Sequence, residues 1–176
     1  MRKSILCLIV LISSNLTFAQ GDKNLIKSSL AAIADFKKKD PGMEKFFKSS
    51  RGYAVFPNVG KGAFIVGGIN GQGVLFVGGV PVGYSELTAV TIGAQAGGQA
   101  YREIIFFEND ETVENFKHGD LKFAAQTSAV AVTAGASSDA NYKTGVAVFT
   151  MAIGGLMLEA SIGGQGFSYK PIEGKK

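Results

Sequence analysis

Apolar side chains recur at helical spacing near the start of the chain. Over residues 25–39 this spacing predicts an amphipathic helix with a single apolar stripe. The stripe comprises Ile26, Leu30, Ile33 and Ala34 and is widened by Leu25 and Phe36. The Asp-Pro-Gly step at residues 40–42 ends this helix, because proline cannot continue one. A second, shorter helix is predicted over residues 43–48.

From residue 53 onward the pattern changes to short apolar runs separated by glycines. Runs at residues 53–56, 63–66 and 74–77 are rich in Phe, Ile, Val and Tyr, which suit strands. The pair Gly71-Gln72 predicts a two-residue hairpin loop. Residues 78–85, which include a proline, predict a further loop.

The second half of the chain predicts more strands and one short helix. Residues 100–108 alternate with apolar side chains on both faces, which is typical of a strand covered on both sides. Asn109 and Asp110 precede a helix predicted over residues 111–117. Further strand-like runs follow at residues 142–153, 156–162 and 167–169. We therefore expect an α+β fold, with a strongly curved antiparallel β-sheet or a small barrel, N-terminal helices and one short helix between strands.

Residues 1–19 have the pattern of a secretory signal peptide. Arg2 and Lys3 precede an apolar stretch at residues 5–12, and residues 17–19 form a small-x-small cleavage site. We expect residues 20–176 to form a single domain, with a basic helical part at 20–51 and a β-rich body at 52–170. The expected location is periplasmic or secreted, or peripheral to the outer membrane.

Charge is distributed unevenly along the chain. Residues 20–61 contain nine basic and four acidic side chains, a net charge of +5. Residues 62–176 contain seven basic and ten acidic side chains, a net charge of −3. A basic end on a slightly acidic body indicates an anionic partner at that end. The export signal and the modest net charge of the processed chain argue against nucleic acid as that partner.

Few residues suggest catalytic or metal chemistry. His118 is the only histidine, and no second histidine or cysteine stands at metal-site spacing from it. The only cysteine, Cys7, lies inside the signal peptide. The acidic residues at 108–114 do not have the spacing of a calcium loop. The sequence therefore predicts a protein that is not an enzyme and has no cofactor or bound metal.

The segment GYAVFPNVGKGAFIVGGINGQGVL at residues 52–75 resembles the opening of a SYLF domain, a Ysc-type lipid-binding domain. It has the aromatic-Val-Phe-Pro run, the Gly-Lys-Gly step and the glycine-rich hairpin of that family. The likeness extends over residues 25–169, although this chain has no tryptophan where the family commonly has one after the first hairpin. The resemblance implies a shared fold and lipid binding, and in eukaryotic relatives contact with actin.

We therefore expect an exported lipid-binding module that engages anionic phospholipid headgroups through its basic N-terminal part. The candidate lipid-binding residues are Lys23, Lys27, Lys37, Lys38, Lys39, Lys45, Lys48 and Lys61. The candidate membrane-facing apolar residues are Ile26, Leu30, Ile33, Phe46 and Phe47. The alternative is a protein-interaction or structural domain of the cell envelope, in which the same lysines meet an acidic protein or are solvated while the apolar stripe packs on the sheet.

Overall fold

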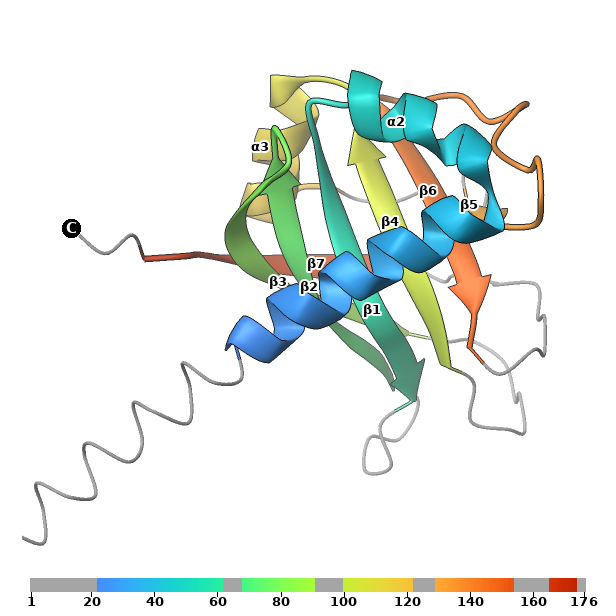
Figure 1. Cartoon of the computed structure of the whole chain (residues 1–176). Coiled ribbons are helices and arrows are strands. Elements are labelled where there is room, and N and C mark those ends of the chain that lie inside the picture. Colours follow the sequence, from blue (N-terminus) through green and yellow to red (C-terminus); the bar gives the residue numbers. More distant parts are fainter. Residues whose placement is uncertain (1–21, 62–67, 91–99, 122–128, 154–164, 174–176) are drawn as a thin grey trace, which may run out of the picture.

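The computed structural model describes residues 22–61, 68–90, 100–121, 129–153 and 165–173, which form a sheet with helices packed on it (Figure 1). The N-terminal helix covers residues 22–39. The later elements are η1 (Pro41–Met43), α2 (Glu44–Ser49), β1 (Gly52–Lys61), β2 (Gly68–Val77), β3 (Val80–Val90), β4 (Ala100–Phe107), α3 (Asp110–His118), β5 (Ala129–Ala131), β6 (Val146–Ala152) and β7 (Gln165–Pro171).

The seven described strands form one sheet in the order β5-β6-β4-β1-β2-β3-β7. Neighbouring strands are antiparallel except for β5 and β6, which are parallel. The predicted α+β class is confirmed, as are the N-terminal helices and the short helix between strands. Because β5 and β7 are the two edges, the described sheet is open, and the small-barrel alternative is not supported.

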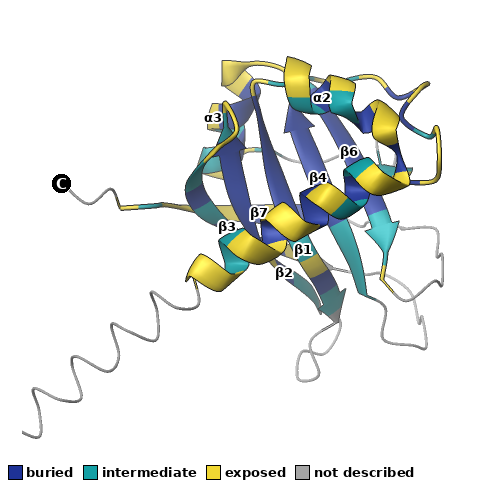
Figure 2. Ribbon diagram, viewed as in Figure 1, coloured by how far each residue is buried: buried dark blue, intermediate teal, exposed yellow. Residues whose placement is uncertain are grey.

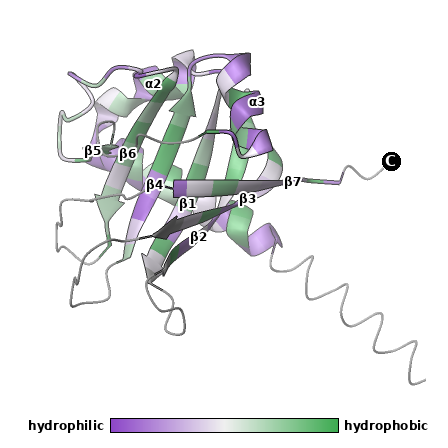
Figure 3. Cartoon of the chain, turned by 180° about the vertical axis from the view of Figure 1, so that it is seen from behind, coloured by the Kyte–Doolittle hydropathy of each residue, from purple (hydrophilic) through white to green (hydrophobic). Residues whose placement is uncertain are grey.

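The sheet is strongly curved, as a contact between distant strands shows. In the strand order, β7 is separated from β4 by β1, β2 and β3. Nevertheless Gln165 of β7 donates a hydrogen bond from Nε2 to Oε2 of Glu103 on β4, at 3.1 Å. A flat sheet would hold these strands about 19 Å apart. The sheet therefore curls so that β7 crosses its back (Figure 3).

The core has two parts, one on each face of the sheet. The outer part lies beneath the N-terminal helix and α2 and contains Tyr53, Phe76, Phe106 and Phe149. The inner part lies on the concave side with α3 and β7, and contains among others Phe107 of β4. Successive residues of β4 alternate between the two parts, which confirms that both faces of this strand are covered. Figure 2 shows buried strands beneath a helix that is exposed along its outer side.

The N-terminal helix packs on the sheet through a different stripe from the one predicted. Ile33 and Phe36 are buried against the outer core, whereas Ala34 is exposed and Leu30 is 52% exposed. The sheet-facing stripe is completed by Ser29 and Ala32. The predicted stripe straddles the boundary between the two sides of the helix, because Ile33 lies on the buried side whereas Leu30 and Ala34 lie on the exposed side.

The glycines of β2 are packing residues, and the hairpin loop predicted at Gly71-Gln72 is wrong. Residues 68–77 form one continuous strand, and the chain turns at Gly78 and Gly79, whose φ angles are 59° and 80°. A Cβ at Gly73 would lie 2.5 Å from the Phe56 ring and 2.6 Å from the Val55 carbonyl oxygen. Glycine is therefore required at position 73 because the neighbouring strand β1 approaches it closely, and not because the chain turns there.

We expect Gly73→Ala to lower the free energy of unfolding by about 1–3 kcal/mol, because neither a buried ring nor a backbone carbonyl can yield without disturbing its neighbours. Denaturant unfolding measures the change. Gly166→Ala in β7 is the matched control, since the nearest atom to its added methyl is Thr88 Oγ1 at 3.3 Å. Equal stability of the two variants would contradict this account of Gly73.

Other local predictions had mixed outcomes. The strand at residues 100–108 and the helix at 111–117 are confirmed as β4 and α3, and Asn109 caps α3 by accepting a hydrogen bond from the Thr112 amide at 3.0 Å. The loop predicted at residues 78–85 is wrong, because β3 already begins at Val80. The predicted runs at 63–66 and 156–162 lie outside the described residues, and so do residues 1–19.

Candidate functional site

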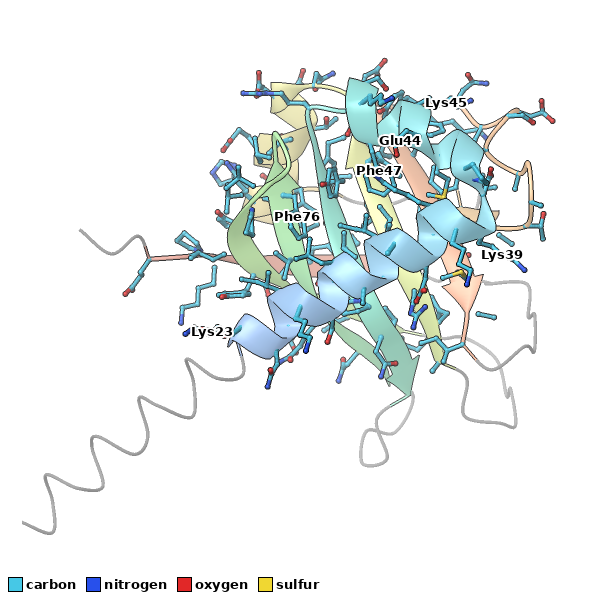
Figure 4. The ribbon with its side chains drawn as sticks, viewed as in Figure 1. Lys23, Lys39, Glu44, Lys45, Phe47 and Phe76 are labelled. Carbon is cyan, nitrogen blue, oxygen red and sulfur yellow. The ribbon has the colours of Figure 1, made fainter. Side chains whose placement is uncertain are left out.

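The predicted basic residues lie on the N-terminal helix, α2 and the end of β1. Lys23 and Lys39 are at opposite ends of the N-terminal helix (Figure 4). On the N-terminal helix, the exposed lysines Lys23, Lys27, Lys38 and Lys39 have no ion-pair partner among the described residues. Lys61 is the last residue of β1, and its side chain lies outside what the structure describes.

One side of the N-terminal helix forms an exposed strip that we call the outer face. It consists of Lys23, Lys27, Leu30, Ala31, Ala34 and Lys38, all exposed. Their spacing places them on one side of an α-helix, over a length of about 22 Å. The outer face therefore has lysines toward both ends and small or apolar side chains between them. The same helix buries its opposite side against the sheet.

The lysines nearest α2 are partly occupied by contacts within the protein. Lys37 Nζ lies 2.9 Å from Glu44 Oε2 and 4.5 Å from the centre of the Phe47 ring. Lys48 Nζ lies 3.9 Å from the other oxygen of Glu44. The hydrogen bond from Lys37 lowers the pKa of the Glu44 carboxyl, with a further contribution from the charge of Lys48. These two lysines are thus less free to contact a partner than those of the outer face.

Lys45 and Asp40 tie the helical part to the loop that follows β5. Lys45 Nζ donates to the Ser138 carbonyl oxygen at 3.2 Å. The buried Asp40 carboxylate accepts hydrogen bonds from the amides of Ser137, at 2.7 Å, and Gly42, at 3.0 Å. Burial acts to raise the pKa of Asp40, but these hydrogen bonds outweigh it and hold the pKa below its ordinary value. The turn between the two helices is therefore fixed in place.

Most of the predicted membrane-facing apolar residues contact the core instead. Phe46 is 3% exposed, with its ring centre 4.9 Å from that of Phe149, and Ile33 is buried as well. Ile26 and Phe47 are half-buried and pack against the same core. Only Leu30 is exposed. The placement of Ile33 and Phe46 on a membrane surface is thus corrected: the sheet offers them an apolar surface of its own.

A groove of ≈ 740 Å³ runs between the N-terminal helix and strands β1 to β4 of the sheet. Leu25, Ser28 and Ala31 line its helix side. Its floor includes Arg102, whose Nη1 lies 2.5 Å from Asp35 Oδ2. The remaining lining residues are Pro57, Asn58, Asn70, Gly71, Gln72, Glu86 and Ile153. The groove is therefore mainly polar and carries charges of both signs.

A buried polar cluster lies on the concave side of the sheet. Glu103 is 0% exposed, and its contact with Gln165 leaves the other oxygen, Oε1, without a hydrogen-bond partner in the described structure. Burial raises the pKa of Glu103 to about 7, although the hydrogen bond from Gln165 acts in the opposite direction. Burial also raises the pKa of Tyr101, and the nearby Glu103 carboxyl adds to this effect. The Glu103 carboxyl is therefore mostly protonated at pH values below about 7.

Sequence reasoning did not select Arg102 or Glu103 as functional residues. The signal was present, because both interrupt a strand that is otherwise apolar on both faces. Alternation assigns Arg102 to the face of Ile104 and Phe106, and Glu103 to the opposite face. A charged residue on a covered strand face needs a partner. The partners, Asp35 and Gln165, are 67 and 62 residues distant in sequence, so only the fold reveals them.

Comparison with known proteins finds a family model that matches part of the chain. The family model Ysc84, described as "Las17-binding protein actin regulator", matches residues 88–171. This range runs from β3 to β7 and lies after both the basic helical part and the segment 52–75. No curated protein matches the chain. None of the helices in the described residues is long and apolar enough to cross a membrane.

Proposed function

Residues 88–171 belong to the Ysc84 family, the SYLF type indicated by the sequence, and on this premise we propose that the chain is an exported, non-catalytic lipid-binding module. It engages anionic phospholipid headgroups through the outer face of its N-terminal helix. The observation that carries the proposal is the composition of this face: all six of its residues are exposed, and the lysines Lys23, Lys27 and Lys38 flank the apolar residues Leu30, Ala31 and Ala34.

The outer face has the chemistry of a helix that lies in the plane of a membrane interface. Lysines contact the phosphate groups, and the apolar residues between them contact the boundary with the acyl chains. A lysine near an anionic surface contributes about 1 kcal/mol. The three lysines of the outer face thus contribute about 3 kcal/mol, which supports reversible, salt-sensitive binding.

Binding of this kind leaves the fold intact. Ile33 and Phe36 hold the opposite side of the helix against the sheet. The helix can therefore rest on a membrane without leaving the core, so the protein associates peripherally. The proposal of export rests on the signal-like pattern of residues 1–19, and N-terminal sequencing of the exported protein tests it.

An acidic protein partner is the alternative. The description of the family names binding to a protein, Las17. The same lysines would serve such a contact, because exposed cations attract any anionic surface. A protein partner would bind without vesicles, which separates the two candidates experimentally.

We expect residues 20–176 to co-sediment with phosphatidylglycerol vesicles at low salt, less at high salt, and little with phosphatidylcholine vesicles. The double variant Lys27→Gln, Lys38→Gln should bind about 30-fold more weakly, since it loses two contributions of about 1 kcal/mol. The variant Lys117→Gln, Lys143→Gln has the same net charge and should bind normally. Absence of binding to both vesicle types, or an equal loss in the control, would sink the lipid proposal.

A further inference from the structure

The floor of the groove contains a row of polar side chains that crosses four strands. Glu86 of β3 pairs with Gln72 of β2, and Gln72 pairs with Asn58 of β1. Arg102 of β4 stands opposite the irregularity at residues 57–58, because its neighbours Tyr101 and Glu103 pair with Val59 and Phe56. We call Glu86, Gln72, Asn58 and Arg102 the polar row. It has a carboxylate at one end, a guanidinium at the other and amides between them.

The groove lies beside the face that we propose to meet the membrane. Ala31 belongs to the outer face and also lines the groove. Leu25 and Ser28 continue the helix side of the groove toward the start of the helix. The groove and the outer face therefore share Ala31, which places the groove next to the proposed membrane contact.

We propose that this groove binds a zwitterionic headgroup that joins a phosphate to a primary ammonium, with its phosphate at Arg102 and its ammonium donating hydrogen bonds to Glu86, a contact that a quaternary choline group cannot make. This inference rests on the proposed function and deepens it, because it names a headgroup class and a second set of contacts. Neighbouring strands lie about 4.8 Å apart, so the backbones at Glu86 and Arg102 are separated by about 14 Å. Both side chains are long, so the distance between their charged groups is set by their rotamers and not by this backbone separation alone.

Arg102 retains hydrogen-bond donors for a phosphate. A guanidinium has five N–H donors, and the contact with Asp35 involves Nη1. The other nitrogen atoms present the planar arrangement that suits phosphate oxygens. Asp35 thus occupies Nη1 and leaves the other nitrogen atoms available to a ligand. Asn58 and Gln72 are exposed and supply neutral hydrogen bonds along the row.

The charges of the groove favour a zwitterion over a plain anion. Arg102 brings one positive charge, while Asp35 and Glu86 bring two negative charges. A purely anionic headgroup would meet this net negative charge without compensation. A headgroup with an ammonium group pairs with Glu86 and removes the repulsion. Selectivity for the ammonium therefore depends on Glu86, and affinity for the phosphate depends on Arg102.

Titration with soluble headgroups, followed by NMR, tests the inference on residues 20–176. Glycerophosphoethanolamine should bind and shift the side-chain amide signals of Asn58 and Gln72, and glycerol 3-phosphate should bind about tenfold more weakly. Glu86→Gln should abolish this discrimination. Arg102→Gln should abolish binding, whereas Asp35→Asn, which breaks the same ion pair but keeps the guanidinium, should bind within about threefold of the unmodified chain.

Failure of this inference is distinguishable from failure of the proposed function. The variant Lys27→Gln, Lys38→Gln should bind the soluble headgroup normally while its binding to vesicles falls. Equal binding of the two soluble ligands, or shifts that avoid Asn58 and Gln72, would overturn the groove assignment even where vesicles bind. These amide shifts are measured on the unmodified chain, so the test stands even where Arg102→Gln does not fold.

Discussion

Replacing Phe46 by alanine is expected to lower the free energy of unfolding by about 3–5 kcal/mol, the usual cost of removing a buried phenylalanine ring. The Phe46 ring lies 4.9 Å from that of Phe149, 5.4 Å from that of Phe106 and 5.6 Å from that of Tyr142. It therefore joins α2 to β4 and β6 as well as filling volume. Chemical denaturation followed by circular dichroism measures the loss.

Leu30→Ala provides the comparison for Phe46→Ala. Leu30 is 52% exposed, so its truncation should change stability by about 0.5 kcal/mol or less. It should nevertheless weaken binding to anionic vesicles, since Leu30 is the largest apolar side chain of the outer face. A stability loss for Leu30→Ala as large as that for Phe46→Ala would show that the helix does not pack as described.

Raising the pH from about 5 to about 8 is expected to reduce stability by about 3 kcal/mol through Glu103 alone. The pKa of Glu103 rises from 4.5 to about 7 on burial. Between these values the folded state binds more protons than the unfolded state, so the free energy of unfolding falls as pH increases. The contribution is complete below pH 4.5 and is lost as the pH passes 7.

Gln165 explains why a protonated Glu103 suits this site. In the described structure, Gln165 Nε2 donates to Glu103 Oε2, while Oε1 of each side chain is unpaired. A proton on Glu103 Oε1 turns that atom into a donor for Gln165 Oε1, and an acid and an amide can form two hydrogen bonds together. Ionisation removes that donor and leaves a buried charge, which weakens the link between β4 and β7.

Glu103→Gln should remove most of this pH dependence, because an amide cannot ionise and has the same shape. Denaturant unfolding of both proteins at several pH values measures the difference in slope. Glu86→Gln on β3 is the matched control, since Glu86 is exposed and its neutralisation should leave the slope unchanged. Asp40 and Glu44, whose pKa values are lowered, change stability only at more acidic pH. Identical slopes for the unmodified chain and Glu103→Gln would refute this assignment.

Local patterns were sufficient to predict several elements. Helical spacing predicted the N-terminal helix, Asn109 predicted the start of α3, and alternation predicted that both faces of β4 are covered. These features depend on residues that are close in sequence, namely a cap, a period or a chain turn. The uneven charge likewise required only counting, and it identified the basic helical part.

Other features depend on what each segment packs against. Gly71 and Gly73 have the composition of a turn, but Val59 and Phe56 of the neighbouring strand occupy the space that their side chains would need. Likewise, the choice between Leu30 and Phe36 as core residues depends on the side of the helix that meets the sheet. Local propensity cannot settle this, because both are apolar.

The sequence alone determined the fold class, the order of most helices and strands, and the basic character of the N-terminal part, since these depend on neighbouring residues. The tertiary structure decided which lysines are free and that Phe46 is buried. It also brought Arg102 to Asp35 and Glu103 to Gln165. The physical reason is the curvature of the sheet and the docking of the helix across it. Both bring together side chains that are more than sixty residues apart in the chain.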